Sequence, residues 1–173
     1  MDFERGRQMT ALRISITAVW LIALMAWPPL FADETPEALI ESAYQLVRKV
    51  YSGPAAASQY NPLDEPNSRK FFTKRVLDSL TEARKKDEMA LDWDPFVAGQ
   101  DAELSDIKIK RLFGTACTAR IEAVFLNFGK PTRIHFDVVR TNVGWRISDI
   151  RGPEYVLTQI GRKRPLPPER GDC

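Results

Sequence analysis

The sequence has few of the residues that most often carry out chemistry: one histidine, His135, and two cysteines, Cys117 and Cys173. A catalytic triad or a Cys-His dyad needs a histidine within hydrogen-bond reach of the nucleophile. In the predicted strands, Cys117 and His135 lie on opposite faces and roughly 23 Å apart. Two distant cysteines and one histidine also cannot complete a zinc shell without several carboxylates. We therefore expect no metal, and we expect His135 on a charged surface with Arg133 and Asp137.

Phosphate-binding loops are also missing, since neither GxGxxG nor GxxxxGK occurs in the chain. No charge of one sign dominates, because 25 Lys and Arg residues stand against 23 Asp and Glu residues, a formal net charge of +2. The short basic clusters at 84–86 and 108–111 are interleaved with acids, a pattern typical of solvated faces. The sequence therefore predicts no nucleic-acid partner and no cofactor.

Residues 1–32 are predicted to be a signal peptide. Three arginines precede an uncharged apolar run over 14–27, and two prolines and the small residue Ala32 follow it. This order is typical of a secretory signal cleaved near Ala32. The alternative is an uncleaved anchor, which the prolines and the polar residues of the run disfavour. We expect a periplasmic or secreted protein with no stable membrane span after cleavage.

Residues 33–160 are predicted to form one domain that begins with helices. Over 35–51, apolar residues recur at helical spacing, Thr35 is a natural N-cap and Pro36 fits the first helical position. A loop over 55–67 follows. A second helix is predicted over 68–86, where an apolar stripe runs along one side.

After residue 101 the apolar period changes from helical spacing to two. Four segments alternate apolar and polar residues, which predicts an antiparallel sheet with one covered and one wet face: 105–112, 118–125, 133–139 and 144–148. The order of helices before strands predicts an α+β domain, with the N-terminal helices packed on one face of a curved four-stranded antiparallel meander.

The connections of this meander are predicted from turn residues and facing pairs. A three-residue loop at 112–114 suits the first hairpin. If Phe125 pairs with Ile134, a four-residue loop over 128–131 closes the second hairpin and keeps the apolar residues on one face. The last hairpin is expected to turn over 141–144. A short helix is expected within 154–161.

Residues 161–173 read as a flexible tail, because they are basic, rich in proline and poor in apolar residues for packing. Export would place Cys117 and Cys173 in an oxidising compartment, where they can pair. However, Cys117 has the parity of a core position and Cys173 ends the tail. The sequence leaves both a disulfide and two free thiols open.

Three stretches carry a resemblance to a known family. FFTKRVLDSL, LDWDPFVAGQD and GWRISDIR, in this order behind a signal peptide, resemble the exported bacterial proteins grouped as domain of unknown function 3828. The closing GWRISDI is similar to the last strand of the nuclear transport factor 2-like superfamily, a cystatin-like α+β fold. The resemblance covers roughly 36–160. It implies a cone-like fold and a bacterial envelope setting, and it brings no established activity.

The stretch LDWDPFVAGQD, 91–101, joins the helical and the alternating parts of the chain. Asp before Pro favours a turn, Asp94 can cap backbone amides, and the two aromatic residues can plug the core, so we expect a structural corner. One alternative is a calcium site, although the stretch departs from the EF-hand order. The candidate ligand or corner residues are Asp92, Trp93, Asp94, Phe96, Gln100 and Asp101.

The export signal and the missing catalytic constellations predict a non-enzymatic binding or accessory module for an envelope protein or a small ligand. The alternative is a small pocket enzyme, hydrolase or isomerase-like, with a buried aspartate of raised pKa as base. Phe136, Trp145 and Asp149 would line such a pocket between sheet and helices. A deep cavity there favours the enzyme, and a filled core beside an exposed apolar patch favours partner binding.

Overall fold

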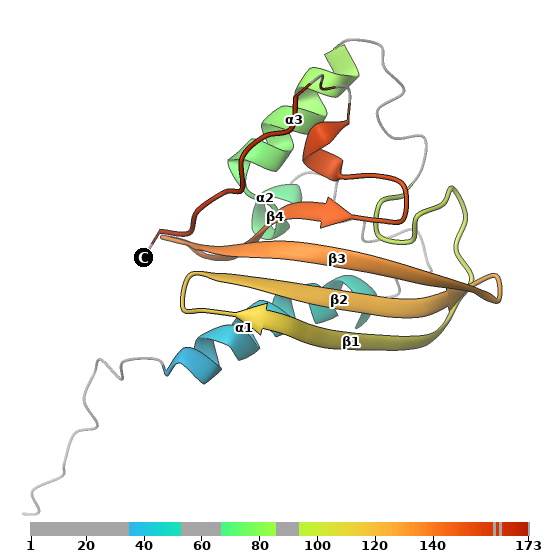
Figure 1. Cartoon of the computed structure of the whole chain (residues 1–173), viewed down its shortest axis with the longest axis horizontal. Helices are drawn as coiled ribbons and strands as arrows, with labels where there is room; N and C mark the ends of the chain where they lie inside the picture. Colours follow the sequence, from blue (N-terminus) through green and yellow to red (C-terminus); the bar gives the residue numbers. More distant parts are fainter. Residues whose placement is uncertain (1–34, 53–66, 86–93, 161, 163, 173) are drawn as a thin grey trace, which may run out of the picture. The chain divides into compact units, whose positions relative to one another are not determined.

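The computed structural model describes residues 35–52, 67–85, 94–160, 162 and 164–172 (Figure 1). Three helices and a 3-10 turn accompany four strands: α1 Pro36–Ser52, α2 Ser68–Phe71, α3 Lys74–Lys85, β1 Leu104–Gly114, β2 Thr118–Asn127, β3 Lys130–Thr141, β4 Gly144–Arg151 and η1 Leu157–Gln159. Among the described residues, no helix is both long and apolar enough to cross a bilayer.

The strands form one antiparallel sheet in the order β1-β2-β3-β4, so the α+β class and the four-stranded meander are confirmed. Alternation places the side chains as predicted. On β2, Ile121 and Phe125 are buried in the core, and Arg120 lies on the opposite face. We call the two sides of the sheet the core face and the polar face.

Helix α1 begins where the sequence predicts, because the hydroxyl of Thr35 accepts a hydrogen bond from the amide of Ala38 at 3.2 Å. Its buried residues recur at helical spacing and meet the core face of the sheet: Leu39, Ala43, Val47 and Val50. In Figure 1, α1 runs behind the sheet, whereas α3 and η1 lie beyond the β4 edge. The two long helices therefore cover different parts of the sheet.

The predicted second helix over 68–86 is wrong in its continuity. The chain leaves the helix at Phe72, which has extended backbone angles of φ −108° and ψ 152°. Phe72 forms a parallel bridge to Ile147, and the amide of Thr73 donates to the Ile147 carbonyl at 3.0 Å. The outer edge of β4 needs hydrogen-bond partners, and the break in the helix supplies them. The helix expected within 154–161 is shortened to the 3-10 turn η1. There, the amide of Thr158 donates a hydrogen bond to the Asp149 carboxylate.

Two predicted hairpin loops are corrected. The first loop lies at 115–117 rather than 112–114, because β1 contains an irregularity after Arg111 and continues its pairing to Gly114. The second is a two-residue turn of Phe128 and Gly129, so Phe125 pairs with Thr132 and not with Ile134. This error in register is two residues, which leaves every side chain on its predicted face. The last hairpin, over 141–144, is confirmed.

The space between the helices and the core face is filled by aromatic rings. Phe96 stacks on Phe136 with ring centroids 6.2 Å apart, and Tyr51 meets the same Phe136 edge-on at 6.0 Å. Tyr51 also lies 5.7 Å from Phe125, and Phe72 lies 6.1 Å from Phe96. We call these five residues the aromatic cluster. Such pairs add to the stability that burial already provides.

The β2–β3 turn generates a prediction about stability. Phe128 has φ 48° and Gly129 has φ 71°, and the phenylalanine side chain is 55% exposed. A left-handed backbone strains a bulky residue, whereas Asn tolerates it and is favoured in such turns. Phe128→Asn should raise the free energy of unfolding by about 1 kcal/mol, measured by chemical denaturation.

Val143→Asn in the β3–β4 turn is the matched control, because Val143 is also exposed and has no positive φ. An equal gain from both substitutions would show that removing an exposed apolar side chain, rather than relieving the backbone, is what stabilises the protein.

Candidate functional site

The predicted corner is formed by Asp94 and Phe96. The Oδ1 atom of Asp94 accepts the amide of Phe96 at 2.7 Å, and the amide of Asp94 donates to the Gly99 carbonyl at 2.7 Å. Phe96 is buried in the aromatic cluster, and its carbonyl accepts the hydroxyl of Tyr51 at 2.8 Å. Asp94 and Phe96 thus hold the corner and anchor it to the core.

Of the other four residues predicted at this corner, two are outside the described residues and two are exposed. Asp92 and Trp93 lie outside the described residues. Gln100 and Asp101 are exposed, and the carbonyl of Asp101 accepts the side-chain amide of Asn127 at 3.4 Å. Within the described ranges, no three His, Cys, Asp or Glu side chains gather closely enough to hold a metal ion.

The residues predicted to line a pocket are placed in three different surroundings. Phe136 is fully buried in the aromatic cluster. Trp145, at the start of β4, borders an open cleft beside α1, and its Nε1 is buried without a hydrogen-bond partner among the described residues. Asp149 lines a separate cavity on the polar side of the sheet. The structure therefore does not bring these three side chains together.

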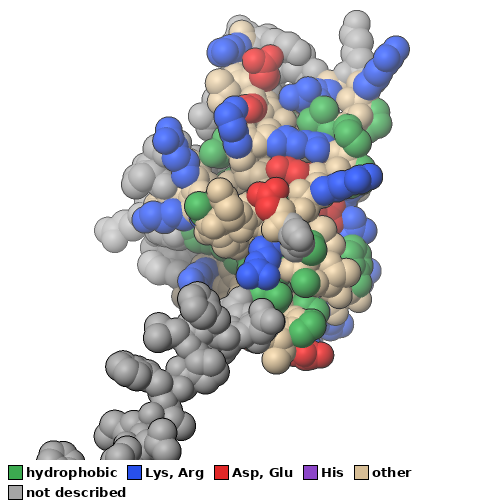
Figure 2. All heavy atoms as spheres, turned by 90° about the vertical axis from the view of Figure 1, so that its left-hand side faces the viewer, with side chains coloured by type: hydrophobic (Ala, Val, Ile, Leu, Met, Phe, Trp, Pro, Cys, Tyr) green, Lys and Arg blue, Asp and Glu red, His purple; other side chains and the backbone are tan. Residues whose placement is uncertain are grey.

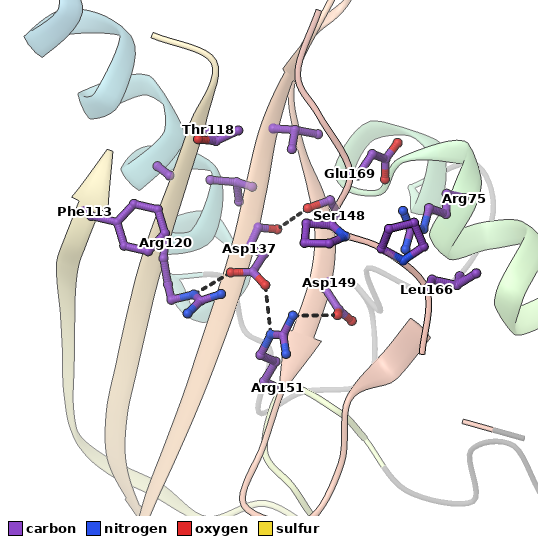
Figure 3. A pocket seen from close by; sticks show the side chains of 15 residues that line it. Arg75, Phe113, Thr118, Arg120, Asp137, Ser148, Asp149, Arg151, Leu166 and Glu169 are labelled. Carbon is purple, nitrogen blue, oxygen red and sulfur yellow. Dashed lines mark hydrogen bonds and ion pairs between the residues drawn. The ribbon is translucent and has the colours of Figure 1, made fainter. Parts of the chain in front are cut away.

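The cavity beside Asp149 has a volume of about 180 Å³ and is the candidate functional site (Figure 3). Its floor is the polar face of β2, β3 and β4, and α3 contributes Arg75 at one side. Its cover is the segment 166–169. The charged lining residues are Arg75, Arg120, Asp137, Asp149, Arg151 and Glu169.

Four of these side chains form a chain of ion pairs across three strands, drawn as dashed lines in Figure 3. Asp137 on β3 lies between two arginines, with Arg120 Nε at 2.5 Å from one oxygen and Arg151 Nε at 2.9 Å from the other. Arg151 also reaches Asp149 at 3.5 Å. Hydrogen bonding and the charge of Asp137 raise the pKa of Arg120 further. The charges on the cavity floor thus neutralise one another.

Asp149 is buried at the end of this chain of ion pairs. Its Oδ1 accepts the amides of Ile150 at 3.0 Å and of Thr158 at 3.1 Å. Burial raises the pKa of Asp149, and these hydrogen bonds and the charge of Arg151 oppose that rise. Both carboxylate oxygens are therefore already engaged, which leaves little freedom for the carboxylate to act as a general base.

His135 and Arg133 lie on the polar face, as predicted, but their partner is not Asp137. Arg133 Nε and His135 Nε2 both lie 3.2 Å from Oε2 of Glu122. The sequence analysis did not single out Glu122. Asp137 instead holds Arg120 and Arg151. The partner of each side chain depends on which residues face one another across strands, and the predicted register was wrong by two.

The cover of the cavity belongs to residues 164–172, which we call the strap. Glu169 accepts the hydroxyl of Thr73 at 2.8 Å, close to the start of α3. Farther along, the amide of Asp172 donates to the Arg140 carbonyl at 2.7 Å. The proline-rich composition predicted a flexible tail. In the structure, these contacts place the strap along α3 and β3, as Figure 1 also shows. Sequence patterns gave no signal for them.

The far end of the strap lies against the loop before β2. A Cβ atom on Gly171 would come within 2.3 Å of the Cys117 carbonyl oxygen, so only glycine fits this approach. Cys117 is disulfide-bonded. The sequence contains one other cysteine, Cys173, which follows the strap and lies outside the described residues.

Comparison with known proteins gives no further guide to this site: no family model, no curated protein and no solved structure matches the chain.

The corner generates a prediction about Asp94. Asp94→Ala removes the acceptor for the Phe96 amide and should lower the free energy of unfolding by about 1–2 kcal/mol. Asp94→Asn keeps an oxygen at that position and removes the charge. Burial raises the pKa of Asp94 above 3.8, so its ionisation costs stability as the pH rises from below 3.8 through the raised pKa. Asp94→Asn should therefore gain stability relative to the natural chain on going from acid to neutral pH.

Urea denaturation of the natural chain and both variants, across that pH range, measures these differences. A stability difference between Asp94→Asn and the natural chain that stays constant with pH would contradict the assigned shift. An unchanged stability of Asp94→Ala would contradict the role of the capping hydrogen bond.

The strap generates a prediction about the disulfide. If Cys117 is bonded to Cys173, then Cys117→Ser and Cys173→Ser should lower the free energy of unfolding equally, by about 2–4 kcal/mol. A reductant should have the same effect on the natural chain and none on either variant. Peptide mapping without reduction checks the pairing directly. A stable Cys173→Ser variant whose unfolding is unchanged would contradict it.

Proposed function

We propose that this protein is exported, periplasmic or secreted after cleavage near Ala32, and that it acts as a non-enzymatic binding or accessory module of the cell envelope. The proposal keeps the resemblance to domain of unknown function 3828 and to the nuclear transport factor 2-like superfamily. The observation that supports it best is the aromatic cluster. It fills the space between helices and sheet where an enzyme of the predicted kind would hold its substrate.

The alternative is a pocket enzyme that uses a buried aspartate. In its favour, burial raises the pKa of both Asp94 and Asp149, which is a common property of catalytic acids and bases. Against it, Asp94 is committed to the corner and Asp149 to two amides and Arg151. The binding role therefore accounts for more of the arrangement.

The surface that best suits a partner lies on β1, over residues 107–113, which we call the β1 margin. β1 pairs with β2 on one side and, among the described residues, with no strand on the other. Three of the five exposed large apolar side chains of the described residues belong to this margin: Ile107, Leu112 and Phe113. Apolar side chains grouped in this way are typical of a protein-binding surface.

The charge of the β1 margin indicates the chemistry of the partner. Lys108, Lys110 and Arg111 are all exposed between the apolar residues. A second copy of the same strand would bring like charges together, and lysines on an edge strand oppose such pairing. We therefore propose an acidic segment of another envelope protein as the occupant, with its carboxylates near the two lysines and its apolar side chains on Leu112 and Phe113.

On the face shown in Figure 2, basic and acidic side chains are interspersed, and apolar side chains gather in small groups. The irregularities in β1 between Ser105 and Lys108, and again after Arg111, bend the strand. They favour recognition by side chains over the addition of a long extra strand.

Site-specific photo-crosslinking in the exporting cell tests the proposal. A photoreactive residue in place of Leu112 should crosslink to one envelope protein, and the same residue in place of Val143, which is equally apolar and 67% exposed, should not. The double substitution Lys108→Glu and Lys110→Glu should abolish the Leu112 crosslink, because carboxylates would then face carboxylates.

Three outcomes would overturn the proposed docking surface: no crosslink from Leu112, a crosslink only to a second copy of this chain, or a crosslink that survives the double substitution. A purified variant with a normal denaturation curve excludes misfolding as the cause of a lost crosslink.

A further inference from the structure

Arg75 has an unusual position among the charged residues of the cavity. Its Nε atom is buried and has no hydrogen-bond partner among the described residues, and no ion pair of those residues includes it. Buried polar groups are nearly always hydrogen-bonded, and a guanidinium taken out of water without a counter-ion is costly. Arg75 as a whole is half-buried, so the structure leaves one buried N–H donor, Nε, without a partner among the described residues.

The other two arginines of the cavity differ from Arg75. Arg120 and Arg151 are held by Asp137, and Arg151 also meets Asp149. Glu169, the acidic residue of the strap that lines the cavity, accepts the hydroxyl of Thr73 and forms no ion pair with Arg75. Among the described residues, Arg75 is therefore the arginine of this cavity that forms no ion pair, and its guanidinium is the one we consider for a ligand.

The surroundings of Arg75 strengthen its attraction for an anion. Arg75 lies near the start of α3 and borders the same cavity as Leu166, Pro167 and Pro168 of the strap (Figure 3). The apolar side chains of these three residues border one side of the cavity. A charge interaction is stronger where the surroundings are less polarisable than water. A guanidinium also offers parallel N–H donors that match the oxygens of a carboxylate or a phosphate.

We propose that this cavity binds a small oxyanion, either inorganic phosphate or the carboxylate group of a small acid, through the guanidinium of Arg75. The cavity volume of about 180 Å³ is enough to hold several water molecules. Phosphate or acetate fits this volume, whereas drug-sized ligands occupy pockets of about 300 Å³ or more. The inference concerns the polar face and does not depend on docking at the β1 margin.

The lining as a whole is neutral, with three arginines and three acids. A bound anion would therefore give the cavity an excess of negative charge, and its affinity would depend on the local donors of Arg75. Burial already raises the pKa of Asp149, and a neighbouring anion would favour its neutral form further. Asp137, Glu169 and the other two arginines also face the cavity and stay paired as described.

Isothermal titration calorimetry of the oxidised full chain, first with phosphate and then with acetate, tests the inference. Saturable binding of either anion is expected, and Arg75→Gln should weaken it about tenfold or more, equivalent to about 1.4 kcal/mol. Lys74→Gln is the matched control: it removes the same charge one residue earlier, and its side chain is 87% exposed and paired with Asp78. It should change the affinity by less than about twofold.

A second measurement keeps the test independent of the folding of the variant. In the natural chain, the NMR resonance of the Arg75 Nε–Hε group should shift as the anion is added. This shift should saturate at the same anion concentration as the heat measured by calorimetry. Arg75→Lys, which keeps the charge and loses this donor, should weaken binding as well. The inference would be overturned if calorimetry gave no saturable heat and the resonance did not move. The cavity would then hold only water. Equal weakening by Lys74→Gln would overturn it too, since the attraction would then be diffuse.

Discussion

The stacking of Phe96 on Phe136 is the contact on which the remaining arrangement depends. It joins the corner formed by Asp94 and Phe96 to the centre of the sheet, and Tyr51 of α1 contacts both Phe136 and the Phe96 carbonyl. Interiors are packed as densely as organic crystals, and among the described residues the aromatic cluster fills the centre of the core face. The candidate site lies instead on the polar face.

The polar face can host such a site because its fourth strand is irregular and its outer edge is covered. The register shift between Asp137 and Val138 gives β4 an additional residue, Ser148, whose hydroxyl donates to the Asp137 carbonyl at 3.1 Å. Asp149 is thereby turned toward the polar face while Ile147 and Ile150 stay in the core. An edge partner at Phe72 and the strap then enclose these polar groups, so the cavity results from closing the β4 edge.

The faces of the elements could be predicted from the sequence, because alternation needs only neighbouring residues. Phe125 and Arg120 lie on opposite sides of the sheet whichever residues they pair with. Register could not be predicted in the same way, since the two-residue turn at Phe128 gains no support from that residue's own preferences. The break at Phe72 was missed for another reason: helical spacing favours a continuous helix, and only the unpaired edge of β4 opposes it.

The candidate site was harder to predict than the fold because its residues come from separate elements. Asp149 was named, but its partners Arg151 and Asp137 meet it only through the strand register. Arg75 follows the break in the helix at Phe72. The predicted continuous helix therefore did not indicate which side of the sheet Arg75 would face. The strap has no apolar periodicity to predict where it packs, and its position depends on the close approach at Gly171 and on local hydrogen bonds. The same contacts explain why Arg75 has no ion pair among the described residues: residues 166–168 of the cover are a leucine and two prolines, and Glu169 accepts the hydroxyl of Thr73.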